Sequence, residues 1–369
     1  MHVGYGSFFQ NLGGSRPDRE VWSSELQLAD RAEALGFDSV WTVEHHFTDY
    51  TMSPSPLQFL SWIAGRTTTV KLGSMVCVLP WHDPVRLAEE AAVLDHLSDG
   101  RLVLGIGRGL ARVEFDGFGV DMSQSRQLFT ERAEAILNSF ETGSINGVEL
   151  RPAPWASLRG RTYASSISPE SAEIMARLGV GIMIFLQKPW EQTVGDIESY
   201  AQRYSEINGA EPPKPLLVIF AACDHDQGRA ERMFEEIVAY YDSTVHHYEF
   251  ENPELARVPG YEYYGRIAER IGKYGRGEFV RFLASLQPWG TPEAVVEQVI
   301  EDVRRVDAAG VIAVCSYGGM SEAQARANQE LFAAEVLPAL RAVNTAAQVG
   351  LPSVPVTYVA ASSYDVNDR

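Results

Sequence analysis

Short apolar runs alternate with amphipathic stretches along most of the chain. The runs are typical of strands buried on both faces, and they lie at residues 2–9, 38–43, 70–79, 101–107, 161–166, 181–186, 216–222 and 311–315. Most are followed by a segment with the 3.6-residue period of a helix, such as residues 18–35, after which Gly36 is a typical helix-terminating glycine. Eight such units without hairpin spacing favour an α/β fold of the (β/α)8 or TIM-barrel type.

Two regions interrupt this rhythm. Residues 143–160 contain glycine and proline and predict a small hairpin. Residues 242–290 form an aromatic-rich insertion before the last βα units. The expected organisation is one barrel domain at residues 1–343, which includes the insertion, and a C-terminal tail at residues 344–369 with few apolar anchors.

The charge balance of the chain is acidic, with 49 acidic and 31 basic side chains and a net charge of −18. This charge repels phosphate backbones and anionic lipids, so neither nucleic acid nor a membrane is an expected partner. The chain shows no secretory signal and no apolar run of the ~20 residues that span a bilayer, which favours a cytoplasmic protein. Cys77, Cys223 and Cys315 lie far apart in apolar runs and are expected to be buried, unreactive thiols.

Polar side chains gather directly after four predicted strands, where a barrel carries its functional groups. They are Glu44, His45 and His46 after the second strand, His82 after the third, Arg108 after the fourth, and serines between residues 165 and 171 after the fifth. The guanidinium of Arg108, together with Ser168 and Ser171 at a helix start, predicts a phosphate site. The alternative is that Ser168 only caps the helix and Arg108 forms a surface ion pair.

Two other interpretations of these motifs fit less well. The run from Gly105 to Leu110 has Leu110 in place of the third glycine of a dinucleotide fingerprint, and a charged loop follows it, which argues against a Rossmann fold. His45 and His46 are adjacent in extended backbone and should point to opposite sides, so this pair is not expected to bind a metal. His46 is therefore expected to be structural.

Several phrases of the sequence resemble the bacterial luciferase-like flavin-dependent monooxygenases, and within them the luciferase alpha subunit. The matching phrases include Glu44-His45-His46-Phe47-Thr48, Val78-Leu79-Pro80, Asp83-Pro84-Val85-Arg86, Arg108-Gly109-Leu110 and Asp121-Met122. The resemblance is dense over residues 36–135. Gly107 stands where the luciferase has a reactive cysteine, so neither an aldehyde substrate nor light emission is specifically predicted.

The resemblance implies a barrel that binds reduced FMN at its carboxyl-end mouth and activates O2 as a flavin C4a-peroxide. His45 would be the catalytic acid/base, with Glu44 positioning it, and a cis peptide at Met75-Val76 would face the flavin ring. The cofactor-binding residues implied are Met75, Val76, Gly107, Arg108, Ser166, Ser168 and Ser171. The expected substrate is a small apolar organic molecule, such as an aldehyde, a ketone or a natural-product intermediate.

The same resemblance implies a separate flavin reductase as a partner and a homodimer. The aromatic insertion would act as a lid that excludes water and selects the substrate. Two alternatives are an F420-dependent hydride-transfer oxidoreductase on the same fold and a non-catalytic flavin-binding partner subunit. The presence of both His45 and Arg108 argues against the latter.

Overall fold

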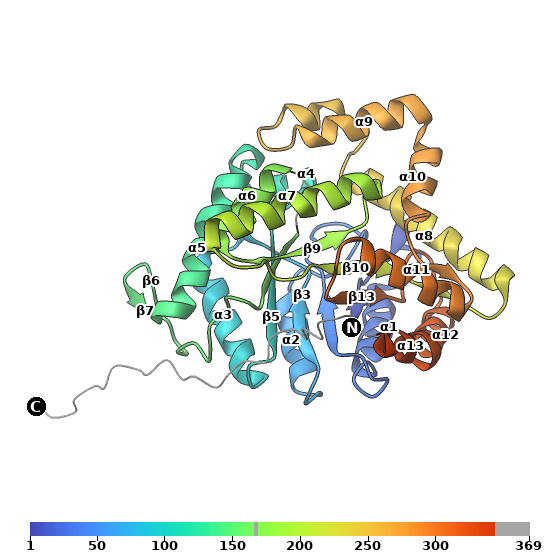
Figure 1. Cartoon of the computed structure of the whole chain (residues 1–369), viewed down its shortest axis with the longest axis horizontal. Coiled ribbons are helices and arrows are strands. Elements are labelled where there is room, and N and C mark those ends of the chain that lie inside the picture. The colour runs from blue at the N-terminus through green and yellow to red at the C-terminus, as the bar shows by residue number, and fades with distance from the viewer. Residues whose placement is uncertain (166–168, 344–369) are drawn as a thin grey trace, which may run out of the picture.

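The computed structural model describes residues 1–165 and 169–343. At its centre eight parallel strand units form a closed barrel (Figure 1). They are β1 (His2–Ser7), β2 (Ser39–Thr42), β3 (Lys71–Ser74) continued by β4 (Cys77–Val78), β5 (Leu102–Gly107), β8 (Thr162–Ser165), β9 (Gly181–Phe185), β10 (Leu216–Phe220) and β13 (Gly310–Val314). Each unit pairs with the next along the chain, and β13 pairs with β1, so the sheet has no free edge. The predicted (β/α)8 barrel is confirmed.

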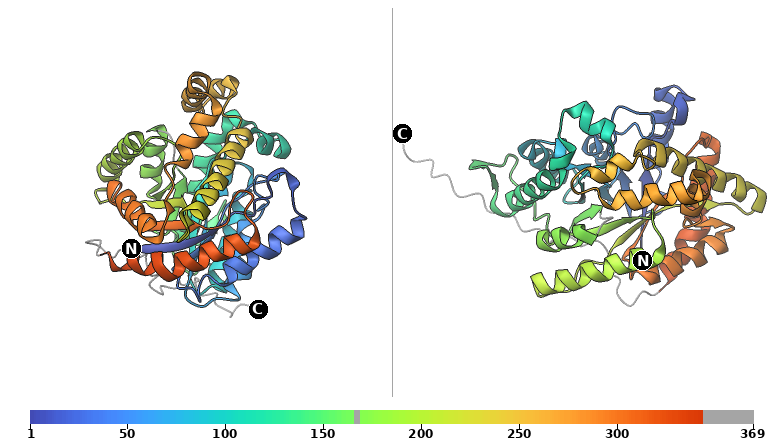
Figure 2. Two further views of the ribbon diagram at one scale, coloured as in Figure 1. Left: turned by 90° about the vertical axis from the view of Figure 1, so that its right-hand side faces the viewer. Right: turned by 90° about the horizontal axis from the view of Figure 1, so that it is seen from above.

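Helices surround this barrel on its outer side, as both views in Figure 2 show. They are α1 (Asp18–Asp30), α2 (Pro56–Ala64), α3 (Pro84–Leu97), α5 (Ser125–Thr142), α6 (Pro169–Leu178), α7 (Trp190–Asn208), α8 (Gln227–His247), α11 (Pro292–Arg305), α12 (Glu322–Leu331) and α13 (Leu337–Ala342). Two of these helices begin at the capping residues that the sequence predicted. The Asp83 carboxylate caps α3 ahead of Pro84, and the Thr291 hydroxyl caps α11 ahead of Pro292.

The barrel interior is filled by side chains, and Trp41 on β2 is the largest of the fully buried ones. Its indole N–H donates to the Ser39 hydroxyl at 2.6 Å. Gly73 on β3 makes room for the ring, because a Cβ at this position would lie 2.0 Å from Trp41 Cε3. The second strand is therefore fixed in a packed interior, and the residues that follow it emerge at a defined point of the barrel mouth.

Two excursions add short elements. The hairpin predicted within residues 143–160 is present as β6 (Ser144–Ile145) and β7 (Val148–Glu149). The segment after β5, predicted as a charged loop, is instead the helix α4 (Arg112–Phe118), which ends at the left-handed Gly119. A seven-residue helix has too few periods for its pattern to stand out in a sequence.

The insertion after β10 is mostly helical. Helix α8 continues through the predicted start of the insertion to His247, and a 3-10 turn (Pro253–Arg257), α9 (Tyr263–Tyr274) and α10 (Arg276–Ala284) follow. The short strands β11 (Ala222–Cys223) and β12 (Trp289–Gly290) pair at its base. Figure 1 and the left view of Figure 2 show α9 above one end of the barrel. Hydrogen bonds from the insertion to His45 and Gly109 identify this as the carboxyl end of the strands.

Cys77, Cys223 and Cys315 are all buried free thiols, as expected. Burial raises the pKa of each above its ordinary value, so the reactive thiolate form is disfavoured at neutral pH. Among residues 1–165 and 169–343, no helix is both long enough and apolar enough to cross a membrane.

Candidate active site

A cleft opens at the carboxyl end of the barrel, between the strand ends and the insertion. It holds about 1120 Å³ of space not filled by atoms, part of which opens to solvent. Several aromatic side chains line it, among them Phe8, Tyr50, Phe129, Phe185, Tyr240 and Tyr264. The predicted residues Glu44, His45, Met75, Val76, Gly107, Arg108 and Ser171 all line it. Segments far apart in the sequence thus meet in one concave, mostly apolar site, the usual setting for small-molecule chemistry.

His45 lies in the loop after β2 and is held from both sides of its ring. Its Nδ1 is 2.9 Å from Oε1 of Glu114 on α4, and its Nε2 is 3.3 Å from the hydroxyl of Tyr248 at the end of α8. The side chain is 12% exposed. Because a carboxylate only accepts hydrogen bonds, Nδ1 carries the proton and Nε2 is the basic nitrogen of the neutral ring.

The sequence predicted that Glu44 positions His45, but the hydrogen bonds of the Glu44 side chain go to other groups. Its buried carboxylate accepts from His46 Nε2 at 3.0 Å, from His82 Nε2 at 2.8 Å, and from Trp81 Nε1 and the backbone N–H of Val78. Burial alone would raise the pKa of Glu44, but these hydrogen bonds outweigh it and lower the pKa to about 2. The carboxylate that contacts the His45 ring is that of Glu114, while Glu44 binds the backbone and side chains of β4 and the loop after it.

Glu114 is a site residue that the sequence interpretation missed. It is 1% exposed, and its Oε1 accepts from His45 Nδ1 and from the backbone N–H of His46 at 2.9 Å. The sequence shows one glutamate in a charged segment, with no sign that it is buried. Gly119, which ends α4, is the signal that could have identified this helix.

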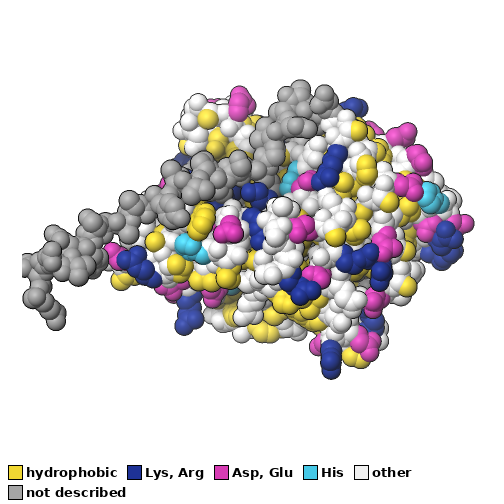
Figure 3. All heavy atoms as spheres, turned by 90° about the horizontal axis from the view of Figure 1, so that it is seen from below, with side chains coloured by type: hydrophobic (Ala, Val, Ile, Leu, Met, Phe, Trp, Pro, Cys, Tyr) yellow, Lys and Arg dark blue, Asp and Glu magenta, His cyan; other side chains and the backbone are white. Residues whose placement is uncertain are grey.

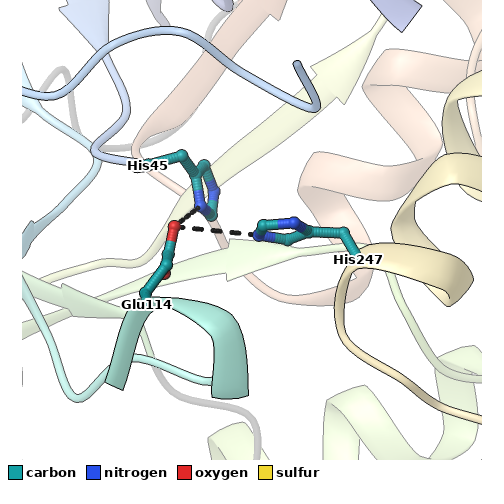
Figure 4. A group of neighbouring side chains, drawn as sticks. All are labelled: His45, Glu114 and His247. Carbon is teal, nitrogen blue, oxygen red and sulfur yellow. Dashed lines mark hydrogen bonds and ion pairs between the residues drawn. The ribbon is translucent and has the colours of Figure 1, made fainter. Parts of the chain in front are cut away.

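His247 and Tyr248 are further site residues that come from the insertion. Figure 4 shows the imidazoles of His45 and His247 both directed toward the carboxylate of Glu114. His247 stacks on Tyr50 with ring centroids 4.3 Å apart. Burial, and then the proximity of His45, lower the pKa of His247 to about 2, so its imidazole is neutral at physiological pH.

The peptide bond between Met75 and Val76 is cis, as the resemblance implied. It lies between β3 and β4, where the run predicted as one strand is divided. Gly107 packs against the Val76 side chain in the cleft wall, because a Cβ at Gly107 would lie 2.3 Å from Val76 Cγ2. A side chain at Gly107 would therefore displace the Val76 side chain from this wall.

Arg108 lies at the junction of the cleft and the insertion. Its Nη1 donates to the carbonyl of Gly260 at 2.7 Å, and its guanidinium lies 4.1 Å from the centroid of the Tyr261 ring. The Tyr261 hydroxyl in turn donates to the carbonyl of Gly109 at 2.9 Å. Arg126 on α5 also lines the cleft, which places two guanidinium groups at this end.

The family of the chain follows from comparison with known proteins. The profile of the luciferase-like monooxygenases matches residues 1–309. The chain belongs to the luciferase-like monooxygenase family. It is 28% identical over 328 residues to the alkanal monooxygenase alpha chain of Aliivibrio fischeri, covering 84% of this chain and 91% of that one. It is also 28% identical over 342 residues to the alpha chain of Photobacterium leiognathi, covering 88% and 94%.

Solved structures share the fold of this luciferase-like chain. Monooxygenase RslO1 from Streptomyces bottropensis has a TM-score of 0.73 at 24% identity, covering 92% of this chain and 99% of its own. The oxygenating constituent of 3,6-diketocamphane monooxygenase from Pseudomonas putida, solved with FMN, has a TM-score of 0.69 at 18% identity and coverages of 92% and 98%. An F420-dependent secondary alcohol dehydrogenase has a TM-score of 0.68 at 15% identity and coverages of 92% and 99%.

In this luciferase-like chain, Ser171 near the start of α6 is brought to the same cleft as Arg108. Ser166 and Ser168 lie outside the described residues. The alternative of a surface ion pair for Arg108 does not match its contacts, which are with the Gly260 carbonyl and the Tyr261 ring. Of the residues predicted to bind a phosphate, Arg108 and Ser171 lie in the described part of the structure, and both line the cleft.

Proposed function

We propose that this chain is the oxygenating component of a two-component monooxygenase that uses reduced FMN and O2 to oxygenate a small apolar organic molecule. The observation that carries the proposal is the position of His45. Its imidazole, fixed by the Glu114 carboxylate, shares one aromatic-lined cleft with Arg108 and Ser171. An acid/base group, an anion-binding group and an apolar wall are the components that such a reaction needs.

The cleft residues fit a flavin. Met75, Val76 and Gly107 form a wall without charged groups, against which a planar ring system can lie. Arg108 and Ser171 supply a guanidinium and a hydroxyl for a phosphate, and Arg126 adds a second cation. When bound, reduced FMN supplies the two electrons with which one oxygen atom of O2 enters the substrate and the other leaves as water.

In this proposal His45 transfers protons, and its contacts support that role. Nδ1 donates to the Glu114 carboxylate, which fixes the ring orientation and stabilises the imidazolium when Nε2 takes up a proton. Nε2 faces the Tyr248 hydroxyl, a neutral group whose pKa burial raises well above its ordinary value. His45 can thus accept a proton at Nε2 and return it within the cleft.

The insertion supplies the cover that this chemistry requires. Tyr248 and Tyr264 line the cleft from the insertion, and Tyr261 closes against Gly109. Water that reaches an oxygen-activating centre promotes side reactions, so a cover of aromatic rings favours transfer of oxygen to the substrate. The same rings favour an apolar substrate over a charged one.

Oxygen transfer can be tested with the purified chain, FMN and a purified NADH-dependent flavin reductase under ¹⁸O₂. The substrate panel would hold a medium-chain aldehyde, a bicyclic ketone and a polycyclic aromatic compound. We expect one ¹⁸O atom in the product of at least one class, detected by mass spectrometry. FMN binding without any labelled product would instead support a flavin-binding partner subunit. Oxidation of reduced F420 coupled to ketone reduction would replace the proposal with hydride transfer.

A further inference from the structure

Three potential metal ligands meet at the edge of the cleft. His45 Nδ1, a carboxylate oxygen of Glu114 and His247 Nε2 all lie within 4.8 Å of one another, a grouping that no other set of residues among 1–165 and 169–343 reproduces. They come from the loop after β2, from α4 and from the end of α8 (Figure 4). The adjacent pair His45 and His46 does not form this group, because His46 binds Glu44.

His247 is the unusual member of the group. Its side chain is 3% exposed and its Nε2 has no hydrogen-bond partner, although it points at Glu114 Oε1 from 3.7 Å. Nδ1 lies 3.4 Å from the Thr48 hydroxyl oxygen. With the proton on Nδ1, the lone pair of Nε2 faces a carboxylate oxygen. Two buried acceptors directed at each other are costly unless a proton or a cation lies between them.

The distances suit a transition-metal ion. Ligand atoms bound at 2.0–2.2 Å to one tetrahedral zinc ion lie about 3.2–3.6 Å apart. The observed separations from Glu114 Oε1 are 2.9 Å to His45 and 3.7 Å to His247, on either side of that range. The two histidine nitrogens lie within 4.8 Å of each other, so side-chain shifts of up to about 1 Å would bring all three atoms into that range.

Glu44 provides an internal comparison, because two imidazoles also converge on it. Its carboxylate additionally accepts from Trp81 Nε1 and the Val78 N–H, so N–H donors occupy its oxygens. His46 and His82 each point a ring nitrogen at it within 3.0 Å. Glu114 Oε1 also accepts two N–H donors, but it additionally faces the unpartnered Nε2 of His247, and Glu114 lines the cleft, through which an ion can enter.

We propose that His45, Glu114 and His247 form a binding site for a divalent transition-metal ion of the zinc class, with the remaining coordination position open to the cleft. Two histidines and one carboxylate are a donor set that zinc accepts. Metal binding at His45 Nδ1 requires the tautomer with the ring proton on Nε2, and this N–H can donate a hydrogen bond to the Tyr248 hydroxyl oxygen, 3.3 Å away. The Thr48 hydroxyl oxygen, 3.4 Å from Nδ1 of His247, can accept the proton-bearing Nδ1–H when Nε2 binds the ion. The bound ion would occupy the acid/base histidine, so zinc would act as a reversible inhibitor.

The site can be tested on the flavin-free protein by titration calorimetry with Zn²⁺ and by the visible absorption of bound Co²⁺. The informative variant is His247→Phe, which removes the ligand but keeps a ring to stack on Tyr50. Glu114→Gln is a second variant that removes a different ligand, and His246→Gln is the matched control at the exposed neighbouring histidine. Melting temperatures confirm that each variant is folded.

We expect one Zn²⁺ per chain in the wild type and in His246→Gln. In other metal proteins, removing a group that hydrogen-bonds to a metal ligand weakens metal affinity by ~10–100-fold. His247→Phe and Glu114→Gln each remove a ligand itself, so the Zn²⁺ affinity should fall by at least that factor. Wild-type affinity in both His247→Phe and Glu114→Gln, or loss of binding in His246→Gln alone, would overturn the site. The titration involves neither flavin nor turnover, so its failure leaves the monooxygenase proposal untouched, and failure of that proposal leaves the metal site standing.

Discussion

His45 and His46 are neighbours in the sequence, yet their imidazoles bind different carboxylates, Glu114 and Glu44. The backbone N–H of His46 also donates to Glu114, so this one carboxylate fixes both the ring and the chain at His45. At the scale of residues, the function proposed for His45 depends on a glutamate from another βα unit. Substitutions of Glu114 and Glu44 should therefore have different consequences.

Glu114→Gln should lower kcat by about 10–100-fold with little change in FMN affinity. The amide can donate to Nδ1, which favours the tautomer with the proton on Nε2 and removes the base. Stopped-flow turnover and flavin fluorescence titration measure the two quantities. Asp116→Asn, on the exposed side of the same helix, is the control and should behave as the wild type. Equal turnover of Glu114→Gln and Asp116→Asn would contradict this role.

Arg108→Ala should weaken binding of FMN but not of riboflavin. A charge-assisted hydrogen bond contributes about 1.5–3 kcal/mol, so the FMN dissociation constant should rise by about 10–100-fold. Riboflavin lacks the phosphate and reports any damage to the ring site. A parallel loss for both ligands would show that Arg108 acts through the Gly260 and Tyr261 contacts instead of through a phosphate.

At the scale of elements, polar contacts from several loops attach the insertion to the barrel mouth. Arg108 joins the β5 end to Gly260, the Tyr261 hydroxyl reaches Gly109, and the Tyr248 hydroxyl reaches His45. Helix α9 contributes Tyr264, Ile267 and Ile271 to its buried side. A segment that packs on the barrel mouth through polar side chains and one apolar face can open without unfolding the barrel.

Tyr261→Ala should loosen this attachment. The variant loses the aromatic ring that contacts the Arg108 guanidinium and the hydroxyl that donates to the Gly109 carbonyl. We therefore expect faster hydrogen exchange over residues 250–285. The barrel strands should exchange as in the wild type. Tyr274→Ala is the control, because Tyr274 is 61% exposed at the end of α9. Identical exchange in both variants would contradict a latch at Tyr261.

At the scale of the whole molecule, the net charge is −18. On the face seen from below, at the end away from the insertion, Figure 3 shows acidic and basic side chains interspersed over the coloured atoms. One buried carboxyl makes global stability depend on pH. Burial raises the pKa of Glu25 on α1 to about 7, and the hydrogen bond from Ser316 opposes this only in part.

Glu25→Gln should flatten the stability profile between pH 4.5 and 8. A raised carboxyl pKa gives stability that is present at acidic pH and is lost as pH rises toward 7. Relative to the variant, the wild type should lose roughly 3 kcal/mol over this interval. Melting temperatures at a fixed scan rate provide the measurement, with the exposed Glu20→Gln as control. If the difference in melting temperature between the wild type and Glu25→Gln stayed constant with pH, a raised pKa of Glu25 would be contradicted.

Much of the fold was predictable because it depends on local patterns. Continuous apolar runs identified all eight strands, and Thr291-Pro292 identified a helix start. The motif around Glu44 and His45 placed the site after β2, and the resemblance placed the cis peptide at Met75-Val76. The dimer, the reductase and the substrate stay predictions.

By itself, the sequence determined the barrel and the position of His45 at its mouth, because periodicity and residue type report which face of a local segment is buried. Only the tertiary structure decided the partners of that histidine. Glu114 lies 69 positions further along and Tyr248 lies 203, and closure of the sheet brings both to one imidazole. A buried glutamate and a solvated one look the same in a sequence, since burial is set by the elements that pack over it.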